Sequence, residues 1–143
     1  MILRDLIVDV KGNIFQIEKP GLVVRVDTSR NEYYHFIIDG PQDSFAISRQ
    51  FWEIILEVIT KDEVTRILIE DRLENKEDLS FQEQADLAKF LTENFIGIHF
   101  AYLEEKISDP EYLLFAEDYV RNRGLTGRYF NNAEAAKDYL ING

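Results

Sequence analysis

Apolar and polar residues alternate with two different periods along the second half of the chain. Short runs rich in β-branched and aromatic residues are each followed by a stretch with apolar residues three or four positions apart, which predicts a strand followed by an amphipathic helix. The predicted strands are Thr65–Asp71, Ile98–Leu103 and Gly127–Phe130, and the predicted helices are Ser80–Phe95, Pro110–Arg123 and Asn132–Ile141. Strands that alternate with helices of this length favour parallel pairing through right-handed crossovers.

The first half of the chain has a different organisation. The runs Leu22–Asp27 and Tyr33–Asp39 are joined by a short polar loop, which predicts an antiparallel hairpin. Before them, Ile14–Glu18 alternates and ends at a Lys-Pro-Gly turn, so we interpret residues 1–21 as an N-terminal extension with short strands. Residues 22–143 are then a single α/β domain. Its expected mixed sheet begins with the antiparallel hairpin and continues with parallel β-α units whose helices pack on the sheet.

A helix predicted at Ser44–Thr60 is apolar around most of its circumference. Phe51, Trp52 and Ile55 form one buried stripe, while Ile54 and Val58 fall largely outside it. Such a helix needs a second cover. The N-terminal extension could supply this cover, and so could another subunit, which would make the protein a homodimer through this helix or the N-terminal strands.

The helix Ser80–Phe95 opens with the sequence Ser-Phe-Gln-Glu, the pattern of a capping box in which the serine and the glutamate each bind a free backbone amide. The helical period predicts that one apolar face points toward the sheet. Its members are Phe81, Ala85, Ala88, Leu91 and Phe95.

Composition narrows the functional classes. With 143 residues, 45% apolar content and no cysteine, the chain predicts one folded domain without disulfides, a thiolate zinc site or a cysteine nucleophile. Arg4, Asp5 and Asp9 interrupt the first apolar run, and the longest apolar runs are too short to span a bilayer. We therefore expect a cytoplasmic protein without a membrane span. Neither a phosphate-binding glycine loop nor a Gly-x-Ser-x-Gly motif occurs, so we expect no cofactor.

Negative charge is concentrated in the middle of the sequence. The net charge is −11, and residues 65–118, with 14 acidic and 5 basic groups, contribute −9 of it. Such a surface repels phosphate backbones, which argues against nucleic acid as a partner. It is either a solvated face or a docking surface for a basic protein partner.

Few residues have the potential for catalysis. His35 and His99, the two histidines, both fall in predicted strands. The acidic loop 70–78 follows the strand Thr65–Asp71, at the strand end where ligands bind in open α/β sheets. Its carboxylates could hold a hard cation, but they lack the ordered spacing of an EF-hand, which favours a solvated loop, so we assign no metal ligand. A small enzyme using His35, His99 or this loop is the alternative function.

The chain is rich in aromatic residues, which could pack together in the core or line a pocket for a small apolar ligand. The candidates for such a pocket are Phe36, Trp52, Phe81, Phe100, Tyr102, Phe115 and Tyr119.

The closing segment is the most characteristic stretch. Its sequence, Gly-Arg-Tyr-Phe-Asn-Asn-Ala-Glu-Ala-Ala-Lys-Asp-Tyr-Leu at residues 127–140, combines an aromatic strand, a short polar turn and an alanine-rich helix with an aromatic–leucine pair. Together with the order of elements, it resembles the SpoIIAA-like family of the STAS superfamily, which is related in fold to CRAL-TRIO lipid-binding domains. The resemblance covers about residues 22–142. It implies a non-enzymatic regulatory or ligand-binding module that acts through a protein partner or a small apolar ligand.

The resemblance also implies a candidate for phosphorylation. In the anti-sigma-factor antagonists of this superfamily, a partner kinase phosphorylates a serine at the start of the helix that follows the central strand. Ser80 is the serine of this chain near that position. The stretch that leads to it, Asp71 to Ser80, is longer and more acidic than the Asp-Ser-(Ser/Thr)-Gly setting of the family and contains no glycine.

Overall fold

The computed structural model describes residues 6–8, 13–107 and 110–143 and contains a mixed seven-stranded sheet. The spatial order of its strands is β1 (Leu6–Val8), β2 (Ile14–Lys19), β3 (Leu22–Asp27), β4 (Tyr34–Asp39), β6 (Arg66–Asp71), β8 (His99–Leu103) and β9 (Thr126–Phe130). Strands β1 to β4 pair antiparallel, and β4, β6, β8 and β9 pair parallel. The predicted fold class, an antiparallel hairpin followed by parallel β-α units, is confirmed.

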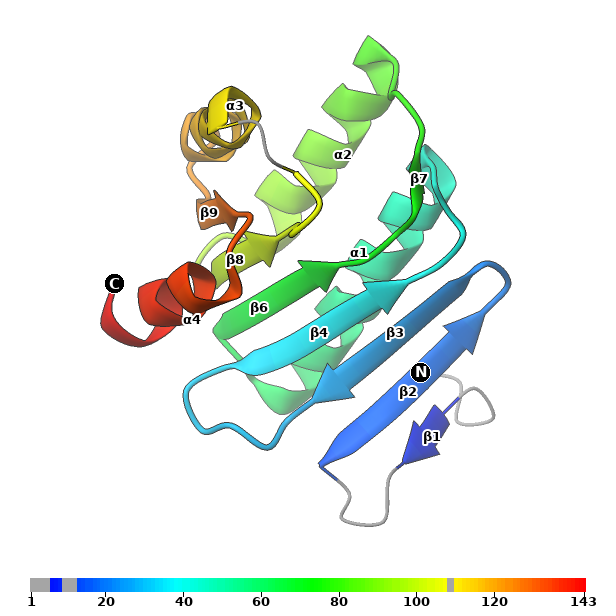
Figure 1. Ribbon diagram of the computed structural model, residues 1–143, viewed down its shortest axis with the longest axis vertical. Helices are drawn as coiled ribbons and strands as arrows, with labels where there is room; N and C mark the ends of the chain where they lie inside the picture. Colours follow the sequence, from blue (N-terminus) through cyan, green and yellow to red (C-terminus); the bar gives the residue numbers. More distant parts are fainter. Residues whose placement is uncertain (1–5, 9–12, 108–109) are drawn as a thin grey trace.

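Helices cover both faces of the parallel part of the sheet. The crossovers between its strands contain α1 (Phe45–Asp62), α2 (Phe81–Asn94) and α3 (Pro110–Arg121), and the chain ends in α4 (Ala133–Asn142). Figure 1 shows α1 and α2 behind the sheet and α4 in front of it. We call the side with α1 and α2 the back face and the side with α4 the front face. A second, two-stranded parallel sheet joins β5 (Gln42–Asp43) to β7 (Asn75–Lys76).

The main core lies between the back face and the helices α1 and α2. Trp52 of α1 is at its centre, with ring centroids 5.1 Å from Phe95, 6.1 Å from Phe100 and 5.9 Å from Tyr102. A smaller core lies on the front face, where Ala136 and Leu140 of α4 cover the sheet. The strands therefore bury alternate residues on both faces, as a sheet with helices on either side requires.

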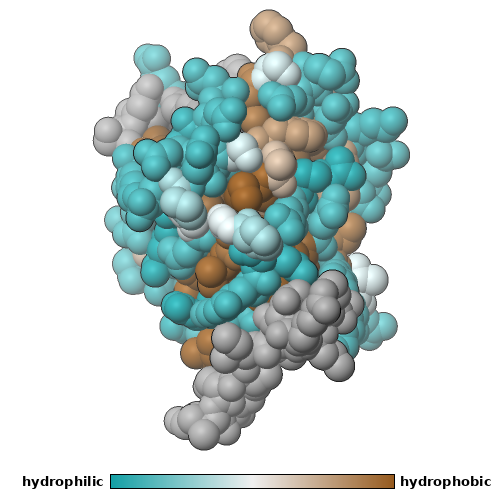
Figure 2. Space-filling model, turned by 90° about the vertical axis from the view of Figure 1, so that its right-hand side faces the viewer, coloured by the Kyte–Doolittle hydropathy of each residue, from teal (hydrophilic) through white to brown (hydrophobic). Residues whose placement is uncertain are grey.

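The second cover of α1 comes from within the chain. Ile54 and Val58 are buried in the same cluster as Ile17 of β2 and Leu91 of α2. On the side seen in Figure 2, hydrophilic residues make up most of the surface and apolar residues form a band through its middle. Among the residues that the structure describes, no helix has the length and apolar character needed to cross a membrane.

The capping box of α2 is present, but the predicted apolar face of this helix is wrong at its start. Ala88, Leu91 and Phe95 are buried, whereas Ala85 is exposed and Phe81 is 91% exposed. Figure 1 shows that the first turns of α2 extend beyond the ends of β6 and β8. The sequence period gives the direction in which Phe81 points, but at that height there is no sheet for its ring to contact.

Candidate functional site

A lysine surrounded by carboxylates lies at the carboxyl ends of the parallel strands. The Lys76 Nζ atom is 2.7 Å from Asp71 Oδ2, 3.3 Å from Glu104 Oε2 and 3.5 Å from Asp43 Oδ2. We call these four residues the Lys76 cluster. Three acidic side chains around one ammonium group leave an excess of negative charge. This excess raises the pKa of the carboxyl groups and favours protonation of one of them.

Four separate segments build this cluster. Asp71 is the last residue of β6 and Glu104 follows β8, while Asp43 and Lys76 end the paired strands β5 and β7. The pairing of β5 with β7 is therefore what brings Lys76 to the strand ends. Below it, the Tyr102 hydroxyl donates to Asp71 Oδ2 at 2.6 Å, so the carboxylate is fixed from both sides.

Burial and charge shift the proton equilibria of the cluster. Burial, reinforced by the neighbouring Asp71 carboxylate, raises the pKa of Glu104 to about 7, although Lys76 opposes the shift. Burial also raises the pKa of Asp43. For Lys76, burial acts to lower the pKa, but the surrounding carboxylates, Asp71 first, outweigh it and raise the pKa. Near neutral pH the cluster thus binds or releases one proton at Glu104.

His35 belongs to a different group of residues, on the front face. Its Nε2 atom is 2.9 Å from Glu70 Oε1, and Arg72 donates from Nε to Glu70 Oε2 at 2.6 Å. Burial lowers the pKa of His35, although the hydrogen bond to Glu70 acts in the opposite direction. A carboxylate bonded to one ring nitrogen fixes the tautomer and orients the ring, which is how histidine bases are held in many enzymes.

His99 lies apart from His35, on β8 beneath α4. Its ring makes an edge contact with Tyr139, with centroids 4.7 Å apart. Its Nε2 atom is buried and has no hydrogen-bond partner among the described residues. Burial, and then the charge of Arg66, lower the pKa of His99. Because β6 lies between the strands of the two histidines, the structure does not combine them in one catalytic site.

The carboxylates of the acidic loop 70–78 turn to different partners. Glu70 binds His35 and Arg72, Asp71 belongs to the Lys76 cluster, and Glu77 accepts a hydrogen bond from Gln42. Within the described ranges, no three His, Cys, Asp or Glu side chains are grouped in a way that could hold a metal ion. The carboxylates that do converge surround the Lys76 ammonium group, and they come from Asp71 of this loop and from Asp43 and Glu104 outside it.

Ser80 and Phe81 stand at the start of α2. The Ser80 Oγ atom accepts from the amide of Glu83 at 3.1 Å, and the Glu83 carboxylate accepts from the Ser80 amide at 3.0 Å. The serine is exposed, and its hydroxyl oxygen caps its own helix. Neither observation tests its phosphorylation, which stays a prediction. Phe81 projects from the next position with its ring almost fully in solvent.

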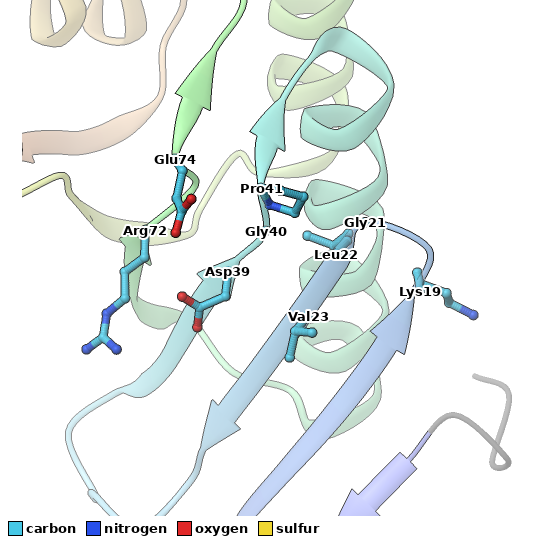
Figure 3. A pocket seen from close by; sticks show the side chains of 9 residues that line it. All are labelled: Lys19, Gly21, Leu22, Val23, Asp39, Gly40, Pro41, Arg72 and Glu74. Atoms are coloured by element: carbon cyan, nitrogen blue, oxygen red, sulfur yellow. The ribbon is translucent and has the colours of Figure 1, made fainter.

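A shallow hollow with a volume of about 410 Å³ lies where the β2–β3 turn meets the end of β4. It is lined by Lys19, Gly21, Leu22, Val23, Asp39, Gly40, Pro41, Arg72 and Glu74. Figure 3 shows Asp39 and Arg72 projecting to one side of the sheet, while Lys19 extends away from them. None of the predicted pocket-lining aromatic residues borders this hollow.

Those aromatic residues lie in different environments. Phe36, Trp52, Phe100 and Tyr102 are buried in the main core, where their rings pack against neighbouring side chains. Tyr119 is partly exposed and donates a hydrogen bond to the Gln84 carbonyl at 3.2 Å. The side chain of Phe115 is outside the described residues. The structure brings only part of the predicted set together.

Three residues of these groups, Lys76, Glu104 and Arg72, are not evident as site residues from the sequence. One signal pointed to Lys76, which is the single basic residue between positions 73 and 88. Comparison with known proteins adds no further candidate, because no family model and no curated protein matches the chain. The SpoIIAA-like resemblance therefore stays a prediction.

Proposed function

We propose that this chain is a non-enzymatic regulatory binding module, of the kind that the SpoIIAA-like resemblance implies, and that it contacts a basic protein partner. The observation that carries the proposal is Phe81, whose ring is 91% exposed within an acidic setting. We define the acidic edge as the segment Glu74–Glu83, which contains Phe81. It has four carboxylates and, in Lys76, one cation.

The acidic edge has a fixed shape. The pairing of β5 with β7 and the ion pairs of the Lys76 cluster hold one end, and the capping box fixes the start of α2. Exposed aromatic residues on rigid supports are common anchors in protein interfaces, because little conformational entropy is lost when they are buried. The exposed carboxylates of Glu77 and Asp78 beside this anchor favour a partner with an apolar pocket bordered by Lys or Arg.

The packing of the core supports a protein partner more than a small apolar ligand. The rings that could line an apolar pocket, among them Trp52 and Phe100, contact one another inside the core. The hollow at the β2–β3 turn is lined mainly by backbone and charged groups, which suit neither a lipid nor an aromatic ligand.

Affinity capture from the native cell with quantitative mass spectrometry tests the proposal. We expect a partner that is retained by the wild type and by Leu114→Ser, an exposed apolar residue on α3, but is lost with Phe81→Ser. Retention should weaken with added salt and with Asp78→Lys, because charge attraction contributes. Equal capture by the wild type and by Phe81→Ser would contradict the proposal.

A second candidate function rests on the His35–Glu70 pair. With Glu70 on Nε2, the other ring nitrogen could act as a general base, and the guanidinium of Arg72 could bind an anionic substrate. Hydrolysis of p-nitrophenyl phosphate and acetate, compared among wild type, His35→Gln and Glu70→Gln, tests it. Turnover that both substitutions abolish would favour the enzyme.

A further inference from the structure

The C-terminal helix α4 packs on the front face of the sheet with fewer buried side chains than α1 packs on the back face. It is ten residues long and contacts the front face of β6, β8 and β9. Its fully buried side chains are Ala136 and Leu140, and Arg66 of β6 donates a hydrogen bond to the Leu140 carbonyl. In Figure 1, α4 lies on the opposite side of the sheet from α1 and α2.

Two buried polar atoms beneath α4 have no hydrogen-bond partner among the described residues, the Tyr33 hydroxyl and His99 Nε2. Tyr33 is only 2% exposed and belongs to the cluster that α4 covers, together with Leu68 and Leu140. His99 faces the ring of Tyr139 on α4. Buried polar atoms without partners are rare, because each has lost its hydrogen bonds to water. Both atoms would regain these bonds if α4 moved away.

Protonation of His99 would make the closed arrangement worse. A protonated imidazole carries a hydrogen on both ring nitrogens, so Nε2 would become a buried donor without an acceptor. Among the described residues, the groups that act on the ring offer no compensating charge. Arg66 on β6 is positive, Tyr139 on α4 is neutral, and Thr126, the register neighbour on β9, carries no charge. Arg128 on β9 lies over the Tyr139 ring, and its charge is paired with Glu117 of α3 at 3.2 Å, so this carboxylate is already engaged.

We propose that α4 is a detachable cover of the sheet, and that it opens as the pH falls because protonated His99 cannot be accommodated beneath it. Opening exposes an apolar strip formed by Leu68, Ala101 and Leu103 and lets water reach the Tyr33 hydroxyl and the His99 Nε2 atom. The direction of this pH dependence follows from proton linkage. Closed His99 titrates below its ordinary value of 6.5, so the closed state binds fewer protons and loses population as the pH falls through that value. One proton changes the open-to-closed ratio by up to about tenfold per pH unit.

Hydrogen–deuterium exchange of the full chain at pH 8 and pH 5.5, corrected for intrinsic exchange rates, tests the proposal. Amides of α4 should exchange faster than those of α1, with a larger difference at pH 5.5. Tyr33→Phe removes one partnerless hydroxyl and should slow exchange in α4 by about tenfold at both pH values. Its matched control is Tyr34→Phe, because the Tyr34 hydroxyl donates to Asp62 at 2.7 Å on the back face. This control should not slow exchange in α4.

A second pair of variants assigns the pH response. His99→Phe should slow exchange in α4 and abolish the additional opening at pH 5.5, whereas His35→Gln should leave that response in place. His35 is the necessary comparison, because Lys137 of α4 lies close enough to lower its pKa. Exchange of α4 only together with α1 would overturn the proposal. So would a Tyr33→Phe variant whose α4 exchanges as fast as that of the wild type, or a full pH response in His99→Phe.

Discussion

At the scale of single residues, one close contact decides how β8 and β9 fit together. Gly127 of β9 lies against the ring of Phe100, and a Cβ atom at this position would be only 2.3 Å from the ring. Phe100 is fully buried and contacts Trp52, so its ring cannot move aside without disturbing the main core. A glycine is therefore required here for space and not for a turn.

Replacing this glycine gives the first prediction. Gly127→Ala should lower the free energy of unfolding by about 1–3 kcal/mol, because the added methyl group overpacks the core. Urea unfolding followed by Trp52 fluorescence measures the change. Thr126→Ala, an exposed neighbour on the same strand, should change stability by less than about 0.5 kcal/mol. The double variant Phe100→Leu with Gly127→Ala should lose less than the two single losses added together, and simple additivity would contradict the packing explanation.

At the scale of elements, the start of α2 is the most explicitly encoded boundary in the chain. Ser80→Ala removes the acceptor for the Glu83 amide and should destabilise the protein by about 1 kcal/mol. Ser80→Asp should stay close to the wild type, because aspartate also caps helices. Thermal unfolding of the three proteins checks this, and an equal loss in both variants would show that the serine contributes something other than a cap.

The two-stranded ribbon of β5 and β7 depends on the Lys76 cluster. Lys76→Met removes the ammonium group and leaves three carboxylates facing one another, which should cost about 1–3 kcal/mol at pH 8, since Lys76 is partly exposed and its ion pairs are partly screened. The loss should shrink at pH 5, where protonation of Glu104 relieves the repulsion. Urea unfolding at the two pH values measures this difference, and Lys89→Met on α2 is an exposed control.

At the scale of the whole molecule, Glu104 links stability to pH. Because its pKa in the folded protein is about 7, against an ordinary value of 4.5, the folded state binds the proton more tightly than the unfolded state. The stabilising contribution is complete below 4.5 and is lost as the pH rises from 4.5 to 7. In the wild type, the free energy of unfolding should fall by about 2–3 kcal/mol across this range because of Glu104, and Glu104→Gln should abolish this fall. Glu105→Gln, at an exposed neighbouring position, should keep it.

The order of elements could be predicted from the sequence because each strand and helix has its own period and its own boundary residues. The candidate site could not be predicted from the sequence, because strand pairing brings its residues together and such pairing leaves no periodic signal. Lys76 reaches the strand ends through a strand of two residues, and His35 meets Glu70 only in the register that aligns β4 with β6. The prediction that Phe81 faces the sheet is wrong because a helical period does not report where the neighbouring sheet ends.

The strand order of the main sheet has a consequence for synthesis. Each strand of that sheet lies next to the one that precedes it along the chain within the sheet, so none has to be inserted later between two neighbours already in place. The sheet can grow from one edge as the chain leaves the ribosome, and every new strand finds its template already formed. The helix α4 must then cross to the side opposite α1 and α2, after β9 has been added.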